Sequence, residues 1–186
     1  MHLTQNEGEP TKFIRDLKEK SSLLLFYEEP KYARSLGFLF LDMGLKSDQL
    51  CLYLSGEPVH NMEKDMIAFG INVTYFKNNN RLRIHSITNH GKDQVASTIE
   101  DFMANAKNHA ARIIIQRDRF SREQQRELLI IEEVVHTMFE KYDVSVLHIY
   151  NTEFMDNAKF MQQIINMHNY TIFAPDFGKG IVIKTK

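Results

Sequence analysis

Short apolar runs alternate with longer amphipathic stretches along almost the whole of this chain. A short, continuous apolar run is typical of a strand that is covered on both faces. The stretches between the runs repeat their apolar residues at helical spacing. Strands that alternate with helices imply a mainly parallel sheet with right-handed crossovers and a layer of helices on each face. The sequence therefore predicts an α/β protein with three layers.

The expected elements follow from this pattern. Strands are expected at residues 23–27, 50–54, 82–87, 111–116 and 144–150. Helices are expected at residues 11–20, 30–43, 58–70, 93–109, 121–142 and 156–168, with Gly44 ending the second of them as a C-cap. Residues 170–174 and 180–183 should pair as a C-terminal antiparallel hairpin. We expect residues 1–11 to be a flexible arm and residues 12–186 to form a single domain.

Composition excludes several classes of protein. The net charge of -1 gives no general attraction to nucleic acid or to an anionic membrane, and acidic residues dilute the arginines of residues 112–126. Direct binding to nucleic acid is therefore not expected. The single cysteine, Cys51, cannot form an internal disulfide, which favours a reducing compartment. With no signal peptide visible and no apolar run near the ~20 residues of a membrane span, we expect a cytoplasmic protein that does not contact the membrane.

Several short motifs follow one another as they do in RecA-like ATPases of the KaiC type. They are Gly44-Leu45, residues 51–55 (CLYLS), 69–71 (FGI), 81–84 (RLRI), 112–115 (RIII) with Asp118, and 144–150 (VSVLHIY). On these motifs the chain resembles that family. The resemblance implies a RecA-like, P-loop-type fold and places Asp118 where such proteins carry the acidic strand that organises magnesium.

The opening segment resembles the MEDS domain, the methanogen/methylotroph DcmR sensory domain, more closely still. Residues 26–29 (FYEE) match its aromatic and acidic opening, and Gly44-Leu45 and residues 51–54 (CLYL) follow in order. This resemblance spans roughly residues 21–184. It implies a degenerate RecA/KaiC-like domain that serves in signalling or transcriptional regulation. Many members carry a histidine just before the first strand, where this chain has Ser21-Ser22, so a role of that histidine does not transfer.

The residues after the first predicted strand do not form a phosphate-binding loop. Such a loop needs glycines that let backbone N–H groups face the phosphates, then a lysine and a hydroxyl that binds magnesium. Residues 27–32 (YEEPKY) contain no glycine, and Lys31 is followed by a tyrosine. Glu28 and Glu29 would in addition repel a polyphosphate. ATP hydrolysis is therefore not expected, and nothing else in the sequence specifies an enzyme.

Polar residues follow the predicted strands at their carboxyl ends, where ligands bind in parallel α/β sheets. This candidate site consists of Tyr27, Glu28, Glu29, Lys31, Ser55, Glu57, Arg117, Asp118, Asn151 and Glu153, with Gln116 and Thr152 between them. A polar rim with an aromatic lip suits a small organic or cationic molecule. The alternative is that these side chains only face water, since strand ends are polar in every fold of this kind.

No cofactor or metal site is expected. The eight histidines show no H-x-H or H-x-x-x-H pair, and only His85 and His90 could meet across a turn. His148 lies within an apolar strand and is expected to be a hydrogen-bonded core residue. Cys51 is expected to be buried packing rather than a nucleophile.

Two hypotheses of function follow. The first is a non-catalytic sensory or regulatory domain that binds a small molecule, or a regulatory protein partner or second copy of itself. The alternative is a vestigial nucleotide-binding subunit that assembles with other proteins. A plain protein-binding scaffold is a third possibility, in which an apolar patch carries the interaction.

Overall fold

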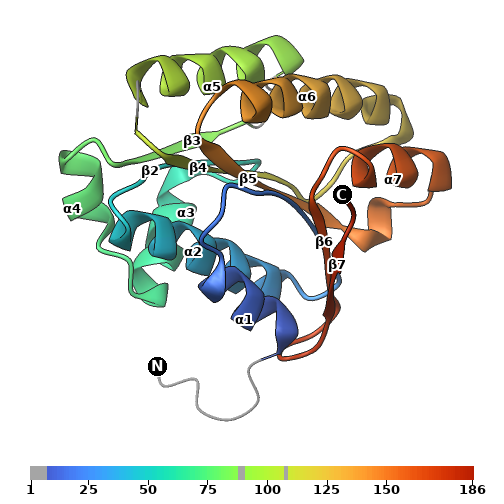
Figure 1. Ribbon diagram of the computed structural model, residues 1–186, viewed down its shortest axis with the longest axis horizontal. Coiled ribbons are helices and arrows are strands. Elements are labelled where there is room, and N and C mark those ends of the chain that lie inside the picture. The colour runs from blue at the N-terminus through green and yellow to red at the C-terminus, as the bar shows by residue number, and fades with distance from the viewer. Residues whose placement is uncertain (1–7, 88–90, 107–108) are drawn as a thin grey trace.

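A seven-stranded sheet forms the centre of the protein (Figure 1). The computed structural model describes residues 8–87, 91–106 and 109–186. The strand order is β3-β2-β4-β5-β1-β6-β7, and all neighbours are parallel except the β6–β7 pair. The strands are β1 (Ser22–Tyr27), β2 (Leu50–Ser55), β3 (Leu82–Ser86), β4 (Ala111–Arg117), β5 (Val144–Asn151), β6 (Tyr170–Ala174) and β7 (Ile181–Lys184). The predicted α/β class and its C-terminal antiparallel hairpin are confirmed.

Helices cover both faces of the sheet (Figure 1). One layer comprises α1 (Glu9–Asp16), α2 (Pro30–Lys46), α3 (Val59–Phe69) and α4 (Val73–Asn78). The other comprises α5 (Lys92–Ala106), α6 (Arg122–Lys141) and α7 (Ala158–Ile165). None of the helices in the described parts of the chain combines the length and apolar character needed to cross a membrane.

The central strand β1 shows why the apolar runs identify this fold. All six of its residues are buried. Leu23 and Leu25 pack with the layer of α1 and α2, whereas Leu24 and Phe26 pack with α6 and α7. Side chains alternate between the two faces of a strand, so cover on both faces accounts for the unbroken apolar run at residues 23–27.

Two of the helix starts have the chemistry that the sequence suggests. Pro30 occupies the first position of α2, where its missing N–H costs nothing. Ser121 and Gln124 form a reciprocal capping box at the start of α6. These local signals account for the residues at which the two helices begin.

The predicted C-cap at Gly44 is wrong. Helix α2 continues through Lys46, and Gly44 is a buried residue within it. Arg112 of β4 passes over Gly44, and a Cβ atom there would lie 2.6 Å from Arg112 Cδ. The guanidinium donates to the Phe40 carbonyl at 2.8 Å and to Gln49 Oε1 at 2.7 Å. The glycine is needed for this close approach rather than for ending the helix.

Other boundaries differ by a few residues. Helix α1 begins at Glu9 rather than at Thr11, so residues 9–11 of the expected arm are helical, while residues 1–7 lie outside the described residues. Helix α5 ends at Ala106, and residues 107–108 of the predicted helix are also outside them. Helix α7 begins at Ala158, because Asn157 caps it, and an unpredicted 3-10 turn, η1 (Thr152–Phe154), precedes it.

Replacing Gly44 by alanine should lower the free energy of unfolding by about 1 to 2 kcal/mol. Alanine favours a helix over glycine by about 1 kcal/mol, but the added methyl group collides with the buried Arg112 side chain. Urea denaturation of the single variants and of the double variant G44A/R112A measures the coupling. Shortening Arg112 should remove most of the cost of the G44A change, and additive effects of the two substitutions would contradict this account.

Candidate functional site

The parallel register places the predicted site residues along one edge of the sheet. Tyr27 lies beside Asn151 at the ends of β1 and β5, and Ser55 lies beside Gln116 at the ends of β2 and β4. Arg117 pairs with Tyr150 between them. The loops that follow these strands therefore meet at the same edge, as expected for a parallel sheet.

A chain of hydrogen bonds crosses three strands at this edge. Tyr27 Oη donates to Asp118 Oδ1 at 2.5 Å, and Gln116 Nε2 donates to the same oxygen at 2.7 Å. Tyr53 Oη donates to Gln116 Oε1 at 2.5 Å. We call Tyr27, Tyr53, Gln116 and Asp118 the strand-end network. It joins the ends of β1, β4 and β2 through hydrogen bonds between side chains.

The two tyrosines of the strand-end network are buried and remain protonated donors. Burial raises the pKa of Tyr27, and its hydrogen bond to Asp118 raises it further. Burial likewise raises the pKa of Tyr53, with the nearby Arg34 acting in the opposite direction. Both hydroxyls therefore hold their protons at neutral pH, so the directions of the hydrogen bonds in the network are fixed.

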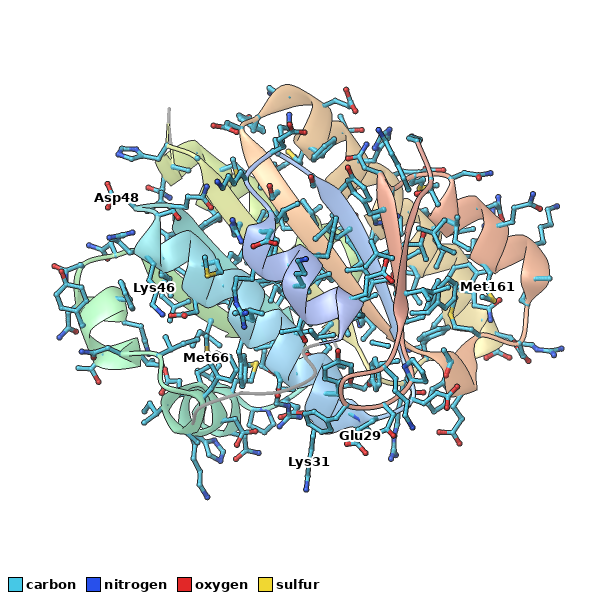
Figure 2. All side chains as sticks on the ribbon, turned by 60° about the horizontal axis from the view of Figure 1, so that its bottom comes forward. Glu29, Lys31, Lys46, Asp48, Met66 and Met161 are labelled. Carbon is cyan, nitrogen blue, oxygen red and sulfur yellow. The ribbon has the colours of Figure 1, made fainter. Side chains whose placement is uncertain are left out.

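The start of α2 already has an anion of its own. Glu29 is the N-cap of the helix, and its Oε1 accepts the Lys31 N–H at 2.9 Å. A phosphate-binding helix leaves such first-turn N–H groups for its ligand. Lys31 is exposed, and Figure 2 shows its side chain pointing away from the body of the protein. Glu28 is exposed as well.

Arg34, which the sequence analysis missed, organises the neighbouring part of the rim. Its guanidinium forms ion pairs with Glu57, in the loop after β2, and with Asp65 of α3. Burial lowers the pKa of Arg34, but the two carboxylates outweigh this effect and the net shift is upward. Ser55 is buried, and its Oγ accepts the Glu57 N–H at 3.3 Å. Arg34 falls on a helix face with no motif around it, so only the fold pairs it with Glu57.

Three predicted residues lie apart from the strand-end network. Arg117 points to the α6 side of the sheet, where it lines a small cavity with Glu127 and Leu128, and burial lowers its pKa. Asn151 accepts the Glu153 N–H at 2.9 Å and so caps the turn η1, and Glu153 is exposed. Thr152 Oγ1 donates to the Tyr27 carbonyl at 3.0 Å, which ties this turn to the end of β1.

The other candidate residues take structural positions. Cys51 is fully buried, and burial raises the pKa of its thiol to about 12, which agrees with its predicted role in packing. His148 is buried in β5 as expected, but neither of its ring nitrogens makes the expected hydrogen bond to the described residues. His85 is exposed, and its proposed partner His90 lies outside the residues that the structure describes.

Replacing Tyr27 by phenylalanine should lower the free energy of unfolding by about 1 kcal/mol, because Asp118 loses one of two donors inside the strand-end network. Urea denaturation measures the change. The matched control is Tyr75→Phe, since Tyr75 is 55% exposed and should tolerate the loss of its hydroxyl. An equal effect at both positions would contradict a buried role for the Tyr27 hydroxyl.

Comparison with known proteins places the chain by its fold. No family model matches it, and no curated protein sequence matches it significantly. A solved structure of a KaiC-like protein from the hyperthermophilic archaeon Pyrococcus horikoshii is similar, with a TM-score of 0.66 and 14% sequence identity. The match covers 84% of this chain and 72% of that one. The chain therefore has the RecA-type α/β fold of a KaiC-like protein.

Proposed function

We propose that this RecA-like domain works without ATP hydrolysis, as a sensory or regulatory module that binds a small molecule at the strand-end edge. The observation that carries the proposal is the strand-end network. Asp118, which takes the position of a magnesium-organising carboxylate in the RecA resemblance, already accepts hydrogen bonds from Tyr27 and Gln116. The Glu29 cap supports the same conclusion, because it places a carboxylate at the helix start where a nucleotide phosphate would bind.

The charge of the rim favours a cationic organic ligand. Glu28 and Glu153 are exposed in the segments that follow β1 and β5, and Asp118, which follows β4, is half-buried. Nearby, Arg34 is already paired with carboxylates. A positively charged ligand gains from the remaining acidic groups, whereas a phosphate is repelled. The resemblance of residues 26–29 to the opening of the MEDS domain agrees with a sensory role and adds Glu28 to the expected contacts.

Native mass spectrometry of the purified chain, with and without magnesium-ATP, tests this function. The expected result is a small co-purifying mass that is indifferent to ATP. Binding of that molecule should weaken about tenfold in Asp118→Asn and in Glu28→Gln, because each change removes one negative charge at nearly constant shape. Glu100→Gln is the matched control, since Glu100 is exposed on α5, in the opposite helix layer. Unchanged binding in both rim variants would overturn the assignment of the site.

The runner-up is a vestigial nucleotide-binding subunit, and the exposed Lys31 beside the start of α2 is the observation that favours it. An ATP adduct in the mass spectrum, lost in Lys31→Ala, would support this alternative over the first proposal. Bare protein in both spectra would instead favour a protein partner or a second copy of the chain, and the charge-state series would report the oligomeric state.

A further inference from the structure

A second polar cluster lies in the core between the sheet and the layer of α6 and α7. It consists of Glu132 on α6, His148 and Tyr150 on β5, and His168 in the turn before β6. Glu132 and His148 are each 1% exposed, and Tyr150 and His168 are each 2% exposed. A carboxylate and two imidazoles buried this deeply need an arrangement that satisfies their charge and their hydrogen-bonding groups.

The distances within this cluster are short. Tyr150 Oη donates to Glu132 Oε1 at 2.6 Å, and His148 Nδ1 lies 2.7 Å from the same oxygen. On the other side of the carboxylate, His168 Nε2 lies 3.5 Å from Oε2. One ligand atom from each of Glu132, His148 and His168 can be chosen so that all three lie within 4.8 Å of one another.

The protonation of His168 follows from its other contact. Its Nδ1 lies 2.7 Å from the Ile164 carbonyl oxygen, which can only accept, so Nδ1 carries a proton. This leaves Nε2 as the ring nitrogen available to a ligand, and it faces Glu132 Oε2 at 3.5 Å. A cation bound by both atoms would lie between them.

His148 adds an independent observation. Neither of its ring nitrogens makes a hydrogen bond of acceptable geometry to the part of the chain that the structure describes, although Nδ1 is close to Glu132. A buried polar group left in this state costs about 1 to 3 kcal/mol. A metal ion would use the nitrogen lone pair that no protein donor satisfies.

We propose that Glu132, His148 and His168 bind one divalent transition-metal ion, of the zinc class, within the core. Imidazole nitrogen and carboxylate oxygen are ligands that zinc takes in proteins, at roughly 2.0 to 2.2 Å. Two ligand atoms of a tetrahedral site with such bonds lie about 3.4 Å apart, so the most widely separated pair would have to close up by as much as about 1.4 Å on binding the ion. The ion would join α6, β5 and the turn that leads into β6.

His136 lies at the margin of this site. It follows Glu132 by one turn of α6, so the two side chains leave the helix on the same face. Its Nδ1 is buried with no hydrogen bond among the described residues, yet the side chain as a whole is half-buried rather than enclosed. It is therefore not among the three buried ligands of the proposed site.

The test uses the full chain, stripped with a chelator and titrated with zinc chloride. Metal analysis after dialysis should find one ion per chain, and the melting temperature should rise with zinc. Cobalt(II) bound in place of zinc should give the visible absorption bands of a metal site with a low coordination number. His168→Gln and Glu132→Gln should each weaken zinc binding at least tenfold, whereas His60→Gln, at an exposed position on α3, should bind as the unmodified chain does.

A second measurement needs no variant and so does not depend on their folding. Long-range proton–nitrogen NMR spectra of the unmodified chain report the state of each imidazole nitrogen. Zinc should shift Nε2 of His168 and one nitrogen of His148. The proposal is overturned if the stripped chain takes up no stoichiometric ion, if only exposed histidines shift, or if His168→Gln retains the ion. None of these results depends on the proposed function at the strand-end edge, because no organic ligand is involved.

Discussion

Replacing Glu132 by alanine is expected to lower the free energy of unfolding of the metal-free protein by about 3 to 5 kcal/mol. The substitution removes the acceptor of the Tyr150 hydroxyl and the only carboxylate among the described residues that contacts His148 and His168. The Tyr150 hydroxyl and the imidazole nitrogens that face Glu132 stay buried without this carboxylate, and the alanine leaves a cavity on the inner face of α6. Denaturation by guanidinium chloride in the presence of a chelator measures the loss.

Glu133→Ala is the matched control for this experiment. Glu133 is the next residue on the same helix but is exposed, and it has the same helix propensity as Glu132. It should change stability little. A small effect at Glu132, equal to that at Glu133, would show that the carboxylate does not hold the cluster together.

Lowering the pH from 7.5 to 5 should destabilise the metal-free protein by about 2 kcal/mol through His168 alone. Burial lowers the pKa of this histidine from 6.5 to about 4. Between those values the unfolded chain binds a proton that the folded protein does not. The contribution of the neutral His168 to stability is therefore fully present above pH 6.5. It falls as the pH drops through this window and levels off below about 4.

Several titratable groups face His168, and their protonation across this pH window affects the prediction. Glu132 faces it from α6, and His148 and Tyr150 face it from β5, with His136 at the margin. Burial alone raises the pKa of Glu132, but its neighbours, led by His148, lower it by more than burial raises it, so the carboxylate stays ionised across the window. Urea denaturation at a series of pH values should show the slope in the unmodified chain and a smaller slope in His168→Gln. Equal slopes would contradict a neutral, buried His168.

The layers of the fold can be predicted from the sequence because a strand that is buried on both faces appears as an unbroken apolar run. Residues 23–27 of β1 form an unbroken apolar run, since alternate residues meet α2 and α6. Prediction from local sequence fails where one residue type can serve two structural purposes. Gly44 has the spacing of a helix end, yet its small size serves the side chain of Arg112, which is far away in sequence. Only the three-dimensional structure, in which α2 packs against β4, reveals that contact.

The candidate site is predictable in position but not in chemistry. The ends of parallel strands must lie along one edge, so Tyr27, Ser55 and Asn151 could be placed together from the strand pattern. Which of them touch depends on the order of strands, and no local motif encodes that Tyr27 meets Asp118. The core cluster left one signal in the sequence. Glu132 interrupts the apolar stripe of Ile131 and Val135 on α6, and a carboxylate in that position requires a buried partner.

The Glu29 cap has a consequence for how this fold can change its ligand. Its carboxylate is tethered beside the N–H groups of α2, so it competes with any free phosphate at an effective concentration on the order of millimolar or above. A phosphate from solution must displace the Glu29 carboxylate, which is covalently attached and cannot diffuse away. Inserting glycines into residues 27–32 would leave the competing Glu29 carboxylate in place. The shortest route from this sequence towards nucleotide affinity therefore starts with the loss of one carboxylate, before any glycine is gained.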